Sequence, residues 1–230
     1  TTPSELPSKF CMTVRQPIGV VGCITPWNFP TAIPIWKIGA ALITGNTIVF
    51  KPASLTPLCV AALVEILEEA GLPPGVLNFV TGGGRSVGMA IVENPRVHAI
   101  SFTGGVPAGR EIYQAAVKYL KPVELELGGK NPQIVMPDAN LDLALEGILF
   151  GAFGTAGQRC TATSRLLLHA DVYDKFLGML TDRLESFTVG NPLDPATGMG
   201  PVVDQSAGEG ITEYIEVGKQ EAKLRYGGER

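Results

Sequence analysis

IGVVGCITPWNFPTAIPIWKIGAALITGNTIVFK, residues 18–51, decides the architecture of this 230-residue chain. The apolar run Ile18–Thr25 predicts a buried strand, which a proline then ends. A helix is expected after Pro34 and should end at Gly45, which suits a left-handed C-terminal position. Thr47–Lys51 has the β-branched composition of a second strand. The stretch therefore predicts a strand–helix–strand unit with parallel strands.

The same alternation continues along the first half of the chain. Further strands are predicted at Val76–Thr81, Val97–Thr103 and Val123–Leu127, and helices at Pro57–Ala70, after the glycines at 82–84, and at Ala108–Tyr119. Apolar strands alternating with helices predict an α/β fold, a Rossmann-like parallel sheet with helices on both faces.

The pattern changes after Gly128-Gly129. Strands are then expected at Gln133–Met136 and Ser164–His169, and helices near Leu141–Phe150, Val172–Phe187 and Ala207–Lys219. We therefore expect a first domain at residues 1–127, lacking its N-terminal part, and a second, partial α/β domain at residues 128–230.

Composition excludes several classes of protein. The chain is 45% hydrophobic and 17% charged, enough apolar material for a packed core, so a disordered chain is not expected. A net charge of −4 argues against a nucleic-acid or anionic-membrane surface. No apolar run approaches the ~18–20 residues needed to span a bilayer.

The N-terminus and the cysteines bear on the cellular compartment. TTPSELPSKF lacks the charged start and apolar core of a signal peptide, and without an initiating Met the sequence is expected to continue upstream. Cysteines at 11, 23, 59 and 160 form no CxxC pair, and there are only two histidines. We therefore expect no metal site, no disulfide framework and a cytoplasmic location.

Cys160 is the candidate nucleophile. It lies in GTAGQRCTATSR, in a predicted loop between a helix that ends at Gly157 and a strand. Nearby arginines and backbone N–H groups favour the reactive thiolate. The alternative is a buried, inert thiol, the commoner fate of a free cysteine, and we interpret the other three cysteines in this way. A protease-like pair with His169 is disfavoured, because nine extended residues span roughly 30 Å at ~3.3 Å each.

Two further polar residues stand in otherwise apolar surroundings. Glu126 lies in VELELGGKNP, where strand alternation puts it on the same face as Glu124. It is either a general base or an exposed acid on an edge strand. Asn28 lies in PWNFP, a proline-bracketed turn that could present its amide to a developing oxyanion or form an ordinary Asx turn.

Glycine loops follow two of the predicted strands. Gly82-Gly83-Gly84 and Gly104-Gly105 each open a helix, where a pyrophosphate could meet backbone N–H groups, although tight turns use glycine anyway. No GxGxxG fingerprint is present. Lys51, at the end of a strand, stands where a nucleotide-binding cation is expected.

In order and spacing, these motifs resemble the aldehyde dehydrogenase superfamily along nearly the whole chain. The matching segments are PWNFP followed by Trp36-Lys37, KPAS with the TP that follows it, FTGG, ELGGKNP, GQRC with its later SR, and NPLDP with MGPV. The resemblance implies that Cys160 attacks an aldehyde and that Asn28 and a backbone N–H stabilise the oxyanion. It also implies that Glu126 activates the hydrolytic water, with an earlier role in deprotonating Cys160 as a further option. Retention of Glu126 favours hydrolysis over transfer to coenzyme A.

The resemblance also implies roles for other residues. Lys37 resembles the proton-relay lysine, and Trp36 a wall of the aldehyde tunnel. The GQRC segment looks closest to dehydrogenases of semialdehydes such as α-ketoglutaric or succinic semialdehyde, so Arg159 either binds a substrate carboxylate or forms a structural ion pair. Cofactor contacts are expected from Ile24, Thr25, Pro26, Trp27, Lys51, Ser54, Gly82, Phe102, Thr103, Gly104, Gly105, Gly109, Leu127 and Gly128.

The chain departs from the family pattern at two positions. Many members that prefer NAD carry a glutamate where this chain has Ser54, and that carboxylate would repel a 2′-phosphate. We therefore expect NADP to be tolerated or preferred. Gly105 replaces a common serine, which removes one hydroxyl contact to the pyrophosphate.

The family's polypeptide is roughly twice this length, and the full-length enzyme is expected to be a homodimer or homotetramer acting on a small aldehyde, without nucleic acid, membrane or metal. Because half of that polypeptide is absent here, two alternatives remain. One is a catalytically silent nucleotide-binding fragment. The other is a cysteine hydrolase without affinity for nucleotides.

Overall fold

The computed structural model of the chain describes residues 5–6 and 8–229. The expectation for the leading TTPSELPSKF therefore falls partly outside the described residues. The chain forms two compact units, the first ending at Leu127 and the second beginning at Gly128. No helix in the described part of the chain is long and apolar enough to cross a membrane.

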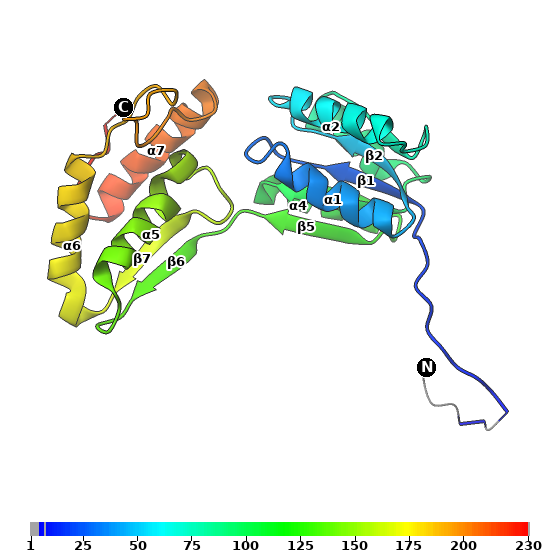
Figure 1. The fold of residues 1–230 in the computed structure, drawn as a ribbon, viewed down its shortest axis with the longest axis horizontal. Coiled ribbons are helices and arrows are strands. Elements are labelled where there is room, and N and C mark those ends of the chain that lie inside the picture. The colour runs from blue at the N-terminus through cyan, green and yellow to red at the C-terminus, as the bar shows by residue number, and fades with distance from the viewer. Residues whose placement is uncertain (1–4, 7, 230) are drawn as a thin grey trace. The chain divides into compact units, whose positions relative to one another are not determined.

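The first unit contains a five-stranded parallel sheet in the order β3-β2-β1-β4-β5 (Figure 1). The alternating α/β fold predicted from the sequence is confirmed. The strands, in chain order, are β1 (Val20–Ile24), β2 (Thr47–Lys51), β3 (Leu77–Phe79), β4 (Ala99–Gly104) and β5 (Val123–Leu127).

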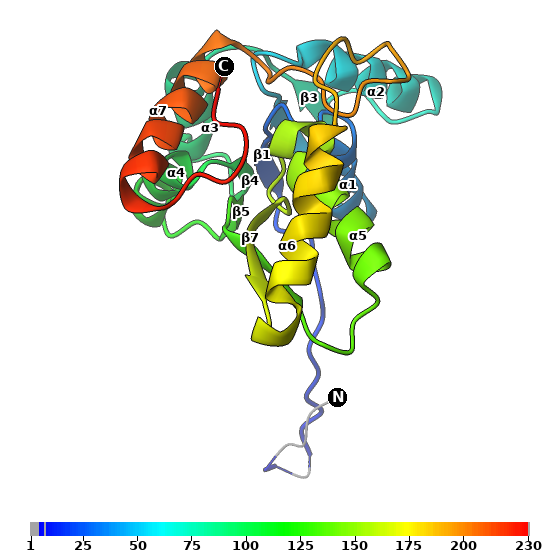
Figure 2. The same cartoon turned by 90° about the vertical axis from the view of Figure 1, so that its left-hand side faces the viewer.

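Helices cover both faces of this sheet (Figure 2). On one face, α1 (Ala32–Ile43) and α2 (Pro57–Glu69) pack on a core that includes Cys23 and Phe50. On the other, α3 (Met89–Glu93) and α4 (Val106–Val117) pack on a core that includes Phe102. Successive strand residues point to opposite faces, so the sequence of each strand divides between the two cores.

Local sequence features explain where most of the helices and strands begin and end. Two of the predicted helices differ from those observed. α1 begins at Ala32 rather than after Pro34, because a proline in the first turn lacks only an N–H that has no helical partner. Gly45 ends this helix with φ 79°, the predicted left-handed conformation. The short helix expected after the triple glycine is a π-helical turn, η1 (Gly84–Gly88), that leads into α3.

The second unit is a smaller α/β layer. Strands β6 (Asn131–Val135) and β7 (Thr163–Leu168) pair in parallel, joined through α5 (Leu141–Phe153). Two longer helices follow, α6 (Ala170–Glu185) and α7 (Gln205–Glu221). Val135, Ile148 and Phe176 form the buried centre of this unit.

A left-handed turn separates α5 from the segment that carries Cys160. In η2 (Gly154–Gly157), Thr155 and Ala156 both have φ 54°, and Gly157 has φ 67°. The prediction that a helix continues to Gly157 is therefore wrong, because right-handed helical geometry ends at Phe153. Non-glycine residues adopt this conformation at a cost, and usually singly.

Candidate functional site

The first candidate site lies at the carboxyl ends of β1 and β4. These neighbouring strands lead into helices on opposite faces, α1 after β1 and α4 after β4. Such a topological switch point is where open α/β sheets bind ligands. A cleft of about 310 Å³ opens here, and its lining includes Ile24, Phe102, Gly88 and Glu111. Two of the predicted cofactor residues, Ile24 and Phe102, are therefore brought to one cleft.

Three of the predicted cofactor glycines, which do not line the cleft themselves, are required by close approaches within the chain. Gly82 has φ 142°, and a Cβ there would overlap Val87. A Cβ on Gly104 would overlap Phe102, and one on Gly109 would come within 2.6 Å of Leu127. α4 starts directly after Gly105, so the free N–H groups of its first turn lie at this end of the sheet.

Several polar groups at the strand ends suit a nucleotide. The Ser54 hydroxyl is exposed and donates to the Gly82 carbonyl at 3.2 Å, which joins two predicted cofactor residues. Lys51 is buried, its Nζ donates to the Pro52 carbonyl at 2.7 Å, and desolvation lowers its pKa. The Thr25 hydroxyl is buried without a hydrogen-bond partner. The residues present thus fit a nucleotide with a polar ribose and phosphate portion.

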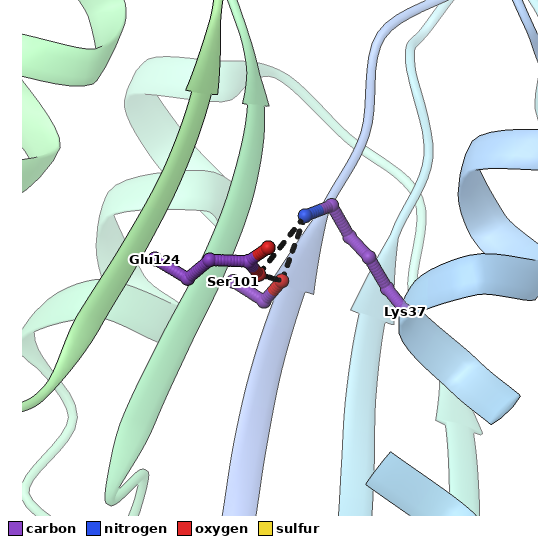
Figure 3. Close-up of polar contacts among 3 residues, drawn as sticks. All are labelled: Lys37, Ser101 and Glu124. Carbon is purple, nitrogen blue, oxygen red and sulfur yellow. Dashed lines mark hydrogen bonds and ion pairs between the residues drawn. The ribbon is translucent and has the colours of Figure 1, made fainter. Parts of the chain in front are cut away.

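On the other face of the sheet, Lys37 joins a polar network beneath α1 (Figure 3). Its Nζ donates to the Ser101 hydroxyl at 2.7 Å and to the Glu124 carboxylate at 3.3 Å. Ser101 also donates to Glu124. The Lys37 side chain is 5% exposed, and that of Glu124 is 60% exposed, so the network connects a buried ammonium to a carboxylate in contact with solvent.

The network continues across the sheet to Cys23. Cys23, Ser101 and Glu124 occupy one row on adjacent strands β1, β4 and β5. Burial raises the pKa of the Cys23 thiol to about 12; the charge of Lys37 lowers that pKa and the charge of Glu124 raises it. Cys23 is thus a neutral core thiol, in agreement with its structural interpretation. Cys11 is half-buried and Cys59, on α2, is exposed, so the prediction of a buried thiol is wrong for Cys59.

The remaining predicted residues of the first unit are accessible. Glu126 and Glu124 are both exposed and point to the same face of β5, the last strand of the sheet. This arrangement matches the predicted shared face, and it is equally the geometry of an edge-strand acid. Asn28 is half-buried in the turn between β1 and α1, after Pro26 and Trp27. Trp36, on α1, is 67% exposed.

In the second unit, Cys160 is an exposed free thiol between η2 and β7. The expected loop position is therefore observed and the thiol is not buried, while its role as nucleophile stays a prediction. The Asn131 side chain donates to the carbonyls of Cys160 and Ala162, at 2.7 and 2.9 Å. The segment that carries Cys160 is thus attached to the start of β6.

The charged neighbours of Cys160 have structural contacts. Arg159 donates to the carbonyls of Phe150 and Gly151 at the end of α5, and its guanidinium lies over the Phe150 ring. Arg165 donates twice to the Lys130 carbonyl. Within the described residues Arg159 forms no ion pair, so the expected structural ion pair is not observed, and its buried Nε has no hydrogen-bond partner. The substrate role of Arg159 stays a prediction.

The His169 side chain forms its hydrogen bond at the start of α6. Its Nδ1 accepts from the Asp171 N–H and caps α6, at the far end of β7 from Cys160. This position agrees with the prediction that His169 does not pair with the thiol. No group of His, Cys, Asp and Glu side chains within the described residues could hold a metal ion.

Sequence reasoning missed Ser101 and Asn131. A serine inside the apolar strand AISFTG was the available signal for the first, since a lone hydroxyl in such a strand needs a partner. For the second, the signal was Pro132 directly after Asn131, because a proline in a strand leaves a gap in its hydrogen-bond ladder.

The chain is similar to aldehyde dehydrogenases along its whole length. The model of the aldehyde dehydrogenase family matches residues 1–230. An α-ketoglutaric semialdehyde dehydrogenase from Bacillus subtilis is 46% identical over 99% of this chain and 47% of its own length. A 2,5-dioxopentanoate dehydrogenase from Saccharolobus solfataricus is 49% identical over 99% of the chain and 48% of its own.

Solved structures agree with the sequence relatives. A betaine aldehyde dehydrogenase from Staphylococcus aureus in complex with NAD+ superposes with a TM-score of 0.90 at 41% identity, over 93% of this chain and 43% of that one. An aldehyde dehydrogenase from Bacillus cereus, also solved with NAD+, gives 0.90 at 42% identity, over 94% and 44%. The chain spans about half the length of the relatives it matches.

Proposed function

Because the chain belongs to the aldehyde dehydrogenase family, we propose that it takes part in the NAD(P)-dependent oxidation of an aldehyde to a carboxylic acid. The observation that carries the proposal is the cleft at the switch point of the first unit, whose lining includes Ile24 and Phe102. In this proposal residues 1–127 form the nucleotide-binding domain and residues 128–230 part of the catalytic domain.

Cys160 begins the proposed reaction. Its thiolate sulfur attacks the aldehyde carbon and forms a C–S bond, and the carbonyl electron pair moves onto oxygen as an oxyanion. The Asn28 amide and the backbone N–H of Cys160 donate to that oxyanion. The nicotinamide, when bound, supplies the acceptor for the hydride that leaves this carbon, so that an acyl thioester remains on Cys160.

Glu126 completes the cycle. Its carboxylate takes a proton from a water molecule, whose oxygen attacks the thioester carbon. The C–S bond breaks, the carboxylic acid leaves and the Cys160 thiolate is restored. Exposure of Glu126 suits this role, because the base must meet water.

The cofactor in this proposal is held by the residues around the switch-point cleft. Ile24 and Phe102 pack along the nucleotide, and the first turn of α4 meets the pyrophosphate. Ser54 and Lys51 bind the adenine ribose. The relatives solved with NAD+ support NAD as one cofactor, and the absence of a carboxylate at Ser54 supports use of NADP as well.

The proposed substrate is a semialdehyde that carries a carboxylate. Support comes from the relatives named for α-ketoglutaric semialdehyde and 2,5-dioxopentanoate. Comparing kcat/KM for such a semialdehyde with that for an uncharged aldehyde of equal length tests this assignment. Equal kcat/KM values for the two aldehydes would refute the assignment of a carboxylate-bearing substrate.

The decisive experiment replaces the nucleophile in the intact protein. Cys160→Ser should abolish aldehyde-dependent formation of NAD(P)H, whereas Cys59→Ser, a change at another exposed cysteine, should leave it intact. Glu126→Gln should slow turnover by about 10²- to 10⁴-fold yet keep a first burst of one NAD(P)H per site, because hydrolysis follows hydride transfer. A slowed burst would assign Glu126 the deprotonation of Cys160 as well. Full activity of Cys160→Ser would refute the mechanism.

A further inference from the structure

The side-chain amide of Asn131 binds two carbonyls in the segment that carries the nucleophile. Nδ2 donates to the Cys160 carbonyl at 2.7 Å and to the Ala162 carbonyl at 2.9 Å. An amide NH₂ has two N–H groups, so each carbonyl can receive its own hydrogen. Asn131 is half-buried at the first position of β6, which restricts its side chain.

A defect in the β6–β7 ladder explains why a side chain is needed there. The register shifts between Asn131 and Pro132, and Pro132 has no N–H to donate to the neighbouring strand. β7 begins only at Thr163, so the Cys160 and Ala162 carbonyls precede the regular ladder. The Asn131 amide supplies the donors that the backbone lacks and extends the pairing as far as Cys160.

The segment that carries Cys160 belongs to neither a helix nor a strand. The left-handed turn at Thr155–Gly157 precedes it, and a single turn hydrogen bond, Ala162 N–H to Arg159 carbonyl at 3.1 Å, spans the thiol. Cys160 therefore sits where neither helix nor strand geometry sets its backbone.

We infer that Asn131 is a positioning residue for Cys160, an inference that rests on the proposed role of this thiol. By holding the Cys160 carbonyl, Asn131 fixes the peptide plane that follows the nucleophile, while the turn hydrogen bond to the Arg159 carbonyl holds the plane that precedes it. The two planes together set the direction of the Cys160 Cα–Cβ bond. The same restraint orients the Cys160 segment whose N–H donates to the oxyanion. Asn131 touches neither aldehyde nor nucleotide and acts only through Cys160.

The test compares Asn131 variants with a matched control in the intact protein. Asn131→Ala removes both donors, and Asn131→Ser keeps one hydroxyl donor. Asn78→Ala is the control, because the Asn78 amide also bridges two carbonyls, those of Ile48 and Gly75, but does so in the first unit. Three quantities are measured: kcat and KM with NAD and aldehyde, the rate at which iodoacetamide alkylates Cys160 by peptide mass spectrometry, and the melting temperature.

Misplacing the thiol should reduce kcat by about 10- to 100-fold in Asn131→Ala, with a smaller loss in Asn131→Ser. Alkylation of Cys160 should slow in the same order, while KM for NAD changes less than about twofold, a split that general destabilisation would not produce. Asn78→Ala should lower the melting temperature without slowing alkylation of Cys160.

Other results would overturn the inference. If kcat and alkylation match the wild type in both Asn131 variants, or if kcat falls while Cys160 alkylates at the wild-type rate, Asn131 does not position the thiol. If Asn131→Ala does not fold, the inference is judged on Asn131→Ser alone, by its kcat and by the rate at which its Cys160 is alkylated. Failure of the proposed function is a separate result, since it appears as oxidation that survives Cys160→Ser.

Discussion

At the scale of single residues, the polar network under α1 shows how the first unit accommodates a buried charge. The Lys37 ammonium is almost fully buried and is compensated by Ser101 and Glu124. Burial raises the pKa of Glu124, but the hydrogen bond from Ser101 and the charge of Lys37 outweigh it, so the pKa lies below its usual value of 4.5. The carboxylate therefore stays ionised at neutral pH.

This lowered pKa predicts an acid-sensitive contribution to stability. A carboxyl whose folded pKa is depressed stabilises the fold above its unfolded pKa and loses that contribution as the pH falls through the folded value. Glu124→Gln should therefore lower the urea midpoint at pH 7 and show a smaller further loss than the wild type between pH 5 and pH 3. Glu65→Gln, at an exposed position of α2, is the control. Equal acid sensitivity of Glu124→Gln and wild type would contradict the network.

Ser54 carries the proposed choice of cofactor. Its exposed hydroxyl reaches Gly82, and no carboxylate stands at this position. Ser54→Glu should reduce kcat/KM with NADP by at least about tenfold, because a carboxylate repels the 2′-phosphate, and should change the value with NAD far less. Ser54→Ala, which adds no charge, should keep most of the NADP activity. Strong NAD preference in the wild-type protein would refute NADP use.

At the scale of elements, the turn η2 is the part of the second unit most at odds with ordinary backbone preferences. Thr155 and Ala156 are both left-handed, at roughly 1–2 kcal/mol each for residues that carry a Cβ. The surrounding structure must offset this cost, and contacts from Arg159 to the end of α5 contribute to doing so. Backbone strain of this kind clusters at functional sites, and here it stands four residues before Cys160.

Relieving the strain should stabilise the protein. Ala156→Gly removes the Cβ penalty but increases the freedom of the unfolded chain, so the free energy of unfolding should rise by about 0.5–1 kcal/mol. Ala62→Gly, at an exposed site within α2, should lower it by about 1 kcal/mol. Urea denaturation of both variants measures the difference. If Ala156→Gly lowered the free energy of unfolding as much as Ala62→Gly does, residue 156 would have a right-handed backbone conformation.

Prediction from sequence succeeded where short-range patterns suffice. Thr47–Lys51 and Val123–Leu127 were predicted with both ends correct, because β-branched or alternating residues stand there between proline and glycine signals. The left-handed η2 was missed because Gly154–Gly157 has a small-residue composition that a helix also accepts. Composition alone does not give the sign of φ at an alanine.

At the scale of the whole molecule, the order of motifs along the chain predicted the family, and the alternation of strands and helices predicted the parallel α/β fold. Neither pattern predicted contacts between distant segments. The Lys37 network joins residues 64 and 87 positions apart, and Asn131 meets the Cys160 carbonyl across 29. Such contacts depend on strand register and helix rotation, which no local pattern encodes.

The strand order of the first unit also has a consequence for biosynthesis. β1 is the central strand, and its partner β4 follows 78 residues later in the chain. At roughly 5–20 residues per second, a ribosome needs about 4–16 seconds to supply that partner. During this interval β1 can already pair with β2 while its other edge stays open, and an open edge of an apolar strand invites pairing with other nascent chains. The rate of translation through residues 52–104 thus sets how long this edge of β1 stays open.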